Sequence, residues 1–160
     1  MNTVTKGALA GAVGGMAMAM WSMIVLWLNG TGFWTPLNLI AHTFWRDAPL
    51  DSRYCFQAAV AGLVVHMLMS MMVGVAFALA VQRVRGSAAS LAFFGMGLAL
   101  LLWAVMQGLV WRTVDAPAAM VFTPWVFATG HAMYGGITGY VVAALRTAGA
   151  RGTAGYAPTR

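Results

Sequence analysis

The sequence predicts an all-α integral membrane protein built as a bundle of four transmembrane helices. Of the 160 residues, 61% are hydrophobic and 8% are charged, whereas about 25% of the residues in a soluble domain are charged. Four uncharged stretches reach the roughly 20 residues that cross a bilayer, and charged, turn-forming segments separate them. We therefore expect one membrane domain over residues 1–146 and a flexible cytoplasmic tail over residues 147–160.

The four spans are expected at about residues 7–28, 57–81, 88–111 and 124–145. The first is expected to be retained, because no small-x-small cleavage site follows it. Small residues recur at four-residue spacing in the spans and so share one helix face. In lipid, helices associate through close backbone approach at such residues. The glycines expected at helix contacts are Gly7, Gly11, Gly15, Gly62, Gly74, Gly135 and Gly139.

A short helix is expected between the first two spans, at about residues 36–45. Thr35 suits its N-cap and Pro36 its first helical position. Apolar residues occupy one face, whereas Asn38 and His42 share another. Two arrangements fit this pattern. The helix lies in the outer interface with His42 in water, or it re-enters the membrane as a lid that holds Asn38 and His42 over the mouth of the bundle.

The basic residues predict that both termini are cytoplasmic. One set of termini and connections holds six basic residues and no acid, and the other holds three basic and three acidic residues. Cytoplasmic loops carry the excess of Lys and Arg. The net charge of +6 is therefore attributed to topology and to anionic headgroups rather than to nucleic acid. The single cysteine, Cys55, excludes an internal disulfide and dithiol redox chemistry.

Three polar side chains are expected at a common level in the outer half of the bundle. At a rise of 1.5 Å per residue, His66, Gln107 and His131 lie roughly 13, 6 and 10 Å from the outer ends of their spans. Polar groups inside a membrane face the bundle interior. These three side chains are therefore candidate cofactor-binding residues that line an outer pocket, with Asn38 and His42 above it.

Several functions fit such a pocket. Haem b could take His66 and His131 as axial ligands. Copper or zinc could take His66, His131, His42 and Met69, because thioether sulfur suits Cu(I). An oligomer could transport protons or small solutes through histidine protonation. Enzymatic chemistry is less supported, because no nucleophile–base spacing is found. Alternatively the imidazoles only bridge helices, and the chain is an accessory or structural subunit.

The segment ATGHAMYGGITGYVVAAL, residues 128–145, resembles the closing helix of the YagU-like and related families of small bacterial inner-membrane proteins. The residues that carry the resemblance are Gly11, Gly15, His66, Gly130, His131, Tyr134, Gly135 and Gly139. The resemblance implies a location in the bacterial inner membrane and implies no activity. The expected partners are the lipid bilayer and other membrane subunits or further copies of the chain, with no nucleic acid.

Overall fold

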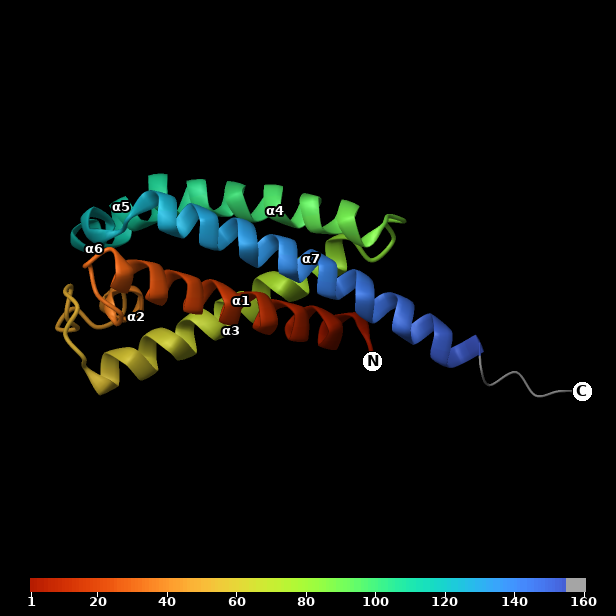
Figure 1. Ribbon diagram of the computed structural model, residues 1–160, viewed down its shortest axis with the longest axis horizontal. Coiled ribbons are helices and arrows are strands. Elements are labelled where there is room, and N and C mark those ends of the chain that lie inside the picture. The colour runs from red at the N-terminus through yellow and green to blue at the C-terminus, as the bar shows by residue number, and fades with distance from the viewer. Residues whose placement is uncertain (155–160) are drawn as a thin grey trace, which may run out of the picture.

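The computed structural model describes the backbone of residues 1–154 and the side chains of residues 1–148, and every regular element in that part is a helix. The long helices are α1 (Thr3–Leu28), α3 (Phe56–Ala80), α4 (Ala88–Val105) and α7 (Pro124–Ala154). The short ones are α2 (Thr35–His42), α5 (Trp111–Val114) and α6 (Ala116–Val121). The three short helices lie together at one end of the molecule (Figure 1).

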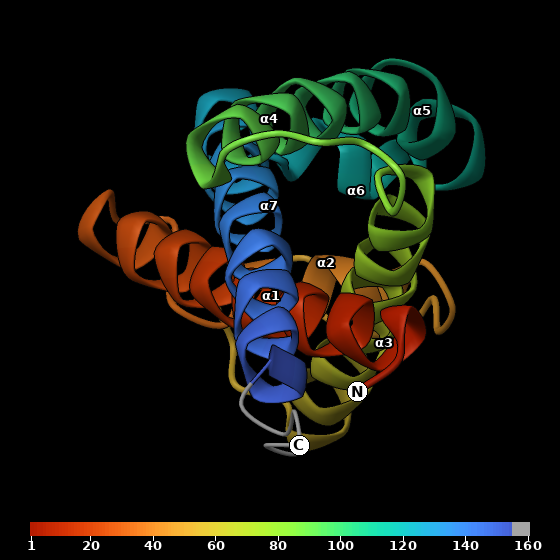
Figure 2. The same cartoon turned by 90° about the vertical axis from the view of Figure 1, so that its right-hand side faces the viewer.

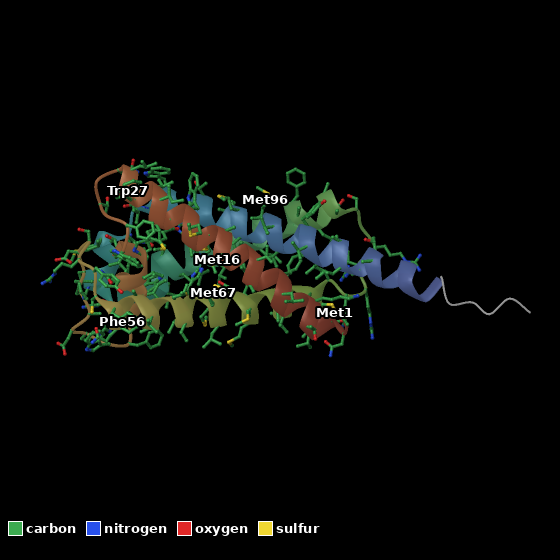
Figure 3. The ribbon with its side chains drawn as sticks, turned by 60° about the horizontal axis from the view of Figure 1, so that its bottom comes forward. Met1, Met16, Trp27, Phe56, Met67 and Met96 are labelled. Atoms are coloured by element: carbon green, nitrogen blue, oxygen red, sulfur yellow. The ribbon has the colours of Figure 1, made fainter. Side chains whose placement is uncertain are left out.

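Three helices are long and apolar enough to cross a membrane. They are α1, α3 and the continuous helix Ala88–Val114, in which a π-helical turn (Met106–Val110) joins α4 to α5. Large apolar side chains cover the outside of these helices. Trp27 and Phe56, with 61% and 63% of their surface exposed, lie at the end opposite Met1 (Figure 3). Exposed apolar surface of this extent is typical of a protein that faces lipid or a partner.

The four long helices follow one another around an arc. Helix α3 packs on α1, α1 packs on α7, and α7 packs on α4 (Figure 2). Helices α3 and α4 approach each other at Phe77 and Phe94, whose ring centroids are 6.2 Å apart. Within the described residues they do not pack along their lengths. The helical arrangement therefore has an open side between α3 and α4.

Glycines set the distance between α1 and α3. A Cβ on Gly7 would lie 2.7 Å from the carbonyl oxygen of Gly74, and a Cβ on Gly11 would collide with the carbonyl oxygen of Ser70. A Cβ on Gly15 would lie 2.6 Å from the Ser70 Cβ. Because no side chain separates the two backbones, the helices approach as closely as small residues allow in membrane proteins.

The contact between α4 and α7 is made in the same way. A Cβ on Gly95 or on Gly135 would collide with the carbonyl oxygen of the other residue, and a Cβ on Gly139 would collide with the α4 backbone. Gly62 has a different partner, since its Cβ would collide with the Leu37 carbonyl of α2. All seven glycines expected at helix contacts thus lie at close approaches, but Gly62 holds the short helix α2.

The ends of α1 and α2 follow local sequence rules only in part. Helix α1 begins after Asn2, whose side chain accepts the Thr5 backbone N–H at 2.8 Å, as an N-cap does. The helix expected at residues 36–45 is shorter and covers Thr35–His42. Thr35 is not its N-cap. That position belongs to Trp34, and the Thr35 hydroxyl donates to the Thr31 carbonyl oxygen at 2.9 Å.

The last helix is longer than expected. The sequence predicted a span that ends near residue 145 and a flexible tail from residue 147. Helix α7 instead continues to Ala154. The rest of the predicted tail, residues 155–160, lies outside the described residues.

Two glycine variants of α4 test whether its backbone contact with α7 stabilises the fold. Gly95→Ala should lower the free energy of unfolding by about 1–3 kcal/mol, because the new methyl group forces the two backbones apart. Gly97→Ala, two residues away with nothing within 4 Å of its Cβ position, should leave stability unchanged or raise it by up to about 1 kcal/mol. Unfolding in mild detergent, followed by circular dichroism, measures both. Equal effects would contradict the proposed contact.

Candidate functional site

A cavity of about 400 Å³, called here the histidine cavity, lies among α1, α2, α3, α4, the π-helical turn, α5 and α7. Four residues that the sequence singled out line it: His66, Met69, Gln107 and His131. The fixed rise of a helix explains why residues of three helices meet at one level. Asn38 and His42 are not among the lining residues.

Both histidines are held by backbone carbonyls. Nε2–H of His66 donates to the Gly15 carbonyl oxygen at 2.9 Å, and Nδ1–H of His131 donates to the Phe127 carbonyl oxygen at 2.8 Å. A carbonyl oxygen only accepts, so the nitrogen that faces it carries the proton. In a neutral imidazole the other nitrogen keeps its lone pair. His66 Nδ1 and His131 Nε2 are therefore the nitrogens that can accept a hydrogen bond or bind a metal.

Two further polar groups in the cavity lining have no partner among the described residues. They are the indole Nε1–H of Trp103 and the hydroxyl of Ser22, and both atoms are buried. A buried donor without a partner costs free energy comparable to a lost hydrogen bond. Neither residue could be predicted from the sequence, because periodicity does not show which indole or hydroxyl lacks a partner.

Gln107 lies within the π-helical turn, together with Met106 and Val110 of the cavity lining. Single π-helical turns inside α-helices are rare and occur frequently at functional sites. The turn interrupts an otherwise continuous helix at the level of the cavity. Gln107, which the sequence analysis expects in an outer pocket, lies in the lining of this cavity, and the sequence gave no sign of the π-helical turn.

Aromatic rings form one wall of the cavity. The ring centroids of Trp111 and Phe122 are 4.7 Å apart, and those of Phe122 and Phe127 are 4.5 Å apart. Trp103 adds a further aromatic side chain to the lining. Flat aromatic walls of this kind accept a planar ring in stacked or edge-on geometry.

Helix α2 covers the cavity with the face opposite to the one expected. Its apolar residues, among them Leu37 and Ile40, line the cavity. Asn38 is fully buried, and its amide donates to the carbonyl oxygens of Asp51 and Arg53 at 2.9 and 2.8 Å. The expected lid with polar residues over the mouth is therefore wrong. The polar face of α2 instead holds the loop that leads to α3.

That loop carries an ion pair of its own. The Arg53 backbone N–H, and then its guanidinium, lower the pKa of the Asp51 carboxyl below its usual value. The side chains of Arg53 and Asp51 are 77% and 58% exposed. An exposed pair contributes little to stability, because water screens both charges.

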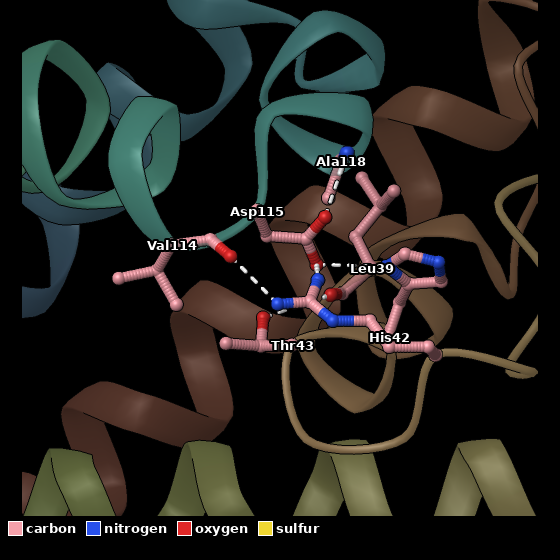
Figure 4. A network of polar contacts seen from close by, with 7 residues as sticks. Leu39, His42, Thr43, Val114, Asp115 and Ala118 are labelled. Atoms are coloured by element: carbon pink, nitrogen blue, oxygen red, sulfur yellow. Dashed lines mark hydrogen bonds and ion pairs between the residues drawn. The ribbon is translucent and has the colours of Figure 1, made fainter.

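A buried acid, Asp115, fixes the other side of α2 (Figure 4). Its Oδ2 accepts Nδ1–H of His42 and a guanidinium N–H of Arg46, both at 2.7 Å. Its Oδ1 accepts the Ala118 backbone N–H at 3.2 Å and so caps α6. A second guanidinium nitrogen of Arg46 donates to the Val114 carbonyl oxygen at 2.6 Å. We call Asp115, His42 and Arg46 the Asp115 cluster.

The Asp115 cluster shows that His42 lies neither in water nor over the mouth of the bundle, the two positions expected from the sequence. The residue is 7% exposed, so it is not in water. It is bonded to Asp115, apart from the cavity in which His66 and His131 lie. Within the described residues, no group of three or more His, Cys, Asp or Glu side chains is placed to hold a metal ion. One sequence signal for the cluster was available, because Asp115 followed by Ala116 and Pro117 is typical of a capped helix start.

Comparisons of the chain with known protein families, with curated proteins and with solved structures find no match. The residues and geometry of the cavity therefore carry the functional argument.

The Asp115 cluster predicts that substitution of Asp115 lowers stability far more than substitution of Asp51. Asp115→Ala should destabilise the fold by roughly 3–5 kcal/mol, because it leaves the buried His42 and the Arg46 guanidinium without their carboxylate. Asp51→Ala removes an exposed acid and should change stability by less than about 1 kcal/mol. Thermal unfolding in detergent compares the two, and limited proteolysis of residues 43–55 reports release of α2. Similar stability of both variants would show that the cluster does not anchor α2.

Proposed function

We propose that this chain is a four-span subunit of the bacterial cytoplasmic membrane with both termini in the cytoplasm. Helix α7 packs between α1 and α4, which belong to helices apolar enough to cross a membrane, and this position supports a fourth span. An Arg146 guanidinium N–H donates to the Val84 carbonyl oxygen at 3.4 Å, so basic residues of α7 and of the α3–α4 connection share one end. The N-terminus lies toward the same end (Figure 1). This clustering of basic residues supports a cytoplasmic location for that end.

We further propose that the subunit binds a small, uncharged, lipophilic molecule in the histidine cavity. The observation that carries this proposal is a largely apolar cavity whose lining holds Gln107 and two imidazoles, His66 and His131, each with one ring nitrogen left free by its backbone hydrogen bond. A ligand with polar atoms would bond to these groups. The cavity volume of about 400 Å³ falls in the range of about 300–1,000 Å³ that is typical of small-molecule sites.

The hydrogen-bonding groups define the ligand further. The Gln107 amide offers a donor, and His66 Nδ1 and His131 Nε2 offer acceptors. No Asp, Glu, Lys or Arg is among the lining residues. A charged ligand would lose its hydration without gaining an opposite charge. The site therefore favours a neutral molecule with oxygen atoms. Association with other membrane subunits or with a second copy belongs to the same proposal.

The proposed function predicts that a bound molecule accompanies the purified protein. Organic extraction of protein purified in mild detergent, followed by mass spectrometry, should find one species in stoichiometric amount. Gln107→Leu should weaken its affinity by about tenfold and so leave the protein only partly occupied, because one hydrogen bond of about 1–1.5 kcal/mol is lost. Gln57→Leu is the matched control, since Gln57 is exposed and outside the cavity. Equal extracts from all three proteins would reject the proposal.

A second candidate function is binding of haem b or copper through His66 and His131. It is favoured by the hydrogen bonds of the two rings. Metal-binding histidines usually donate their other N–H to a carbonyl or carboxylate, which fixes the ring and raises its basicity. His66 and His131 both show this arrangement. His66 would bind through Nδ1 and His131 through Nε2, and Met69 of the lining could supply a thioether to Cu(I).

The second candidate predicts a spectroscopic or elemental signal. Purified protein should show a Soret band for haem, or about one copper per chain by elemental analysis. His66→Ala and His131→Ala should each remove the signal, because each deletes one of two ligands. Gln57→Leu again serves as the control, since Gln57 is exposed and lies outside the cavity. Colourless, metal-free protein that still carries an extractable lipophilic molecule would reject this candidate and retain the first.

A further inference from the structure

A second cavity, called here the apolar seam, continues the histidine cavity along the open side of the molecule. It has a volume of about 250 Å³ and lies between α3, α4 and α7. The two cavities share three lining residues, Val73, Leu102 and Tyr134. The seam therefore lies directly beside the histidine cavity, and a molecule longer than that cavity would reach the seam past these three side chains.

The seam offers hydrocarbon contacts and little else. Its polar lining residues are Tyr134 and Thr138, and their hydroxyls are already engaged. The Tyr134 hydroxyl donates to the Ser70 carbonyl oxygen at 2.7 Å, and the Thr138 hydroxyl donates to the Ala10 carbonyl oxygen at 3.5 Å. A hydrocarbon chain that enters from the bilayer would lose no hydrogen bond in the seam and would gain close carbon–carbon contacts with its walls.

The open side of the helical arc explains how such a chain could enter. Small residues on both helices border the seam, with Ala76 and Ala80 on α3 and Gly95 and Ala99 on α4. Ala76 and Ala80 are exposed. Because α3 and α4 do not pack along their lengths in the described part of the chain, the seam faces the surroundings of the helices. For a membrane protein, those surroundings are acyl chains.

The histidine cavity suits the polar end of a simple lipid, and the apolar seam suits its hydrocarbon end. The histidine cavity has aromatic walls and uncommitted donors and acceptors, whereas the seam is apolar. Neither cavity has Asp, Glu, Lys or Arg in its lining. A phospholipid head would bring an unpaired phosphate charge into such a site, which is costly. A flat, neutral ring with oxygen atoms meets none of these obstacles.

We infer that the ligand is a quinone-type lipid, with a neutral oxygen-bearing ring in the histidine cavity and a single hydrocarbon tail in the apolar seam, and that it reaches the site from the bilayer between α3 and α4. A carbonyl oxygen of the ring accepts from the Gln107 amide, and the aromatic side chains of the lining pack against the ring. In the reduced ligand, hydroxyl groups donate to His66 Nδ1 or His131 Nε2. This inference rests on the proposed ligand-binding function and specifies the ligand class and its route.

The test compares two probes on three proteins. The probes are a benzoquinone with a decyl tail and the same benzoquinone without a tail. The proteins are the full chain, Ala76→Phe and Ala61→Phe, each in lipid nanodiscs, with Kd measured by isothermal titration calorimetry. Phe at position 76 fills the seam from its exposed border. Ala61 is equally exposed on α3 but borders neither cavity, so it controls for the added aromatic ring.

With Kd referred to the probe concentration in the bilayer, the full chain should bind the decyl probe about tenfold more tightly than the tailless probe, because on the order of ten more close carbon–carbon contacts than a fluid acyl chain makes suffice for that ratio. Ala76→Phe should bring the ratio close to one and leave the tailless probe unchanged, whereas Ala61→Phe should keep the ratio of the full chain. If Ala76→Phe and Ala61→Phe behave alike, the tail does not occupy the seam and the inference fails. If neither probe binds the full chain, the quinone class is wrong.

These outcomes are separable from failure of the proposed function. A full chain that binds neither quinone but still yields an extractable molecule reduced in Gln107→Leu retains the ligand site and overturns only the quinone inference. A full chain with no bound molecule and no affinity for either probe overturns both.

Discussion

The structure depends on direct backbone contact between helices at glycine. In lipid there is no hydrophobic force between helices, so their association relies on close packing. Gly11 of α1 lies against the backbone of α3, and Gly95 and Gly135 bring the backbones of α4 and α7 together. In both contacts the two backbones are closer than they could be if the glycines carried side chains. They create two tight pairs, and the α1–α7 contact joins the pairs into one arc.

The histidine cavity is a consequence of this arrangement. Because α3 and α4 are each drawn to another partner, space remains between them along the described chain. The side chains that face this space include His66, Gln107 and His131. Backbone carbonyls accept hydrogen bonds from the two imidazoles and so orient both rings. The indole Nε1–H of Trp103 and the hydroxyl of Ser22, two residues of the lining, are buried without a partner among the described residues.

At the end where the short helices gather, a buried charge decides the position of α2. A carboxylate that is removed from water must be paired and hydrogen-bonded. Asp115 meets this requirement through His42, Arg46 and the Ala118 N–H. These bonds hold one side of α2, and contact of the Leu37 carbonyl with Gly62 holds another. The apolar face of α2 is consequently turned toward the cavity, and the Asp115 cluster acts on the site by placing its cover.

The prediction from sequence succeeded where a physical rule connects neighbouring residues. Apolar length predicted the long helices, because a chain in lipid must satisfy its backbone groups within each helix. The rise of 1.5 Å per residue placed His66, Gln107 and His131 at one level, and all three line one cavity. Local rules failed at the edges, where α2 is shorter and α7 longer than the pattern indicated.

Contacts between distant segments decided the rest. His42 and Asp115 are 73 residues apart in the chain, and no spacing rule pairs them. The open side of the arc depends on which helices attract each other, and four glycine-bearing helices can be arranged in several orders. The availability of the Trp103 and Ser22 polar atoms depends on what surrounds them. The positions of the long helices and the depth of their polar residues therefore follow from local geometry and the apolar solvent. The neighbours of each helix, the cover that α2 provides and the unpaired polar atoms are decided only when the helices pack.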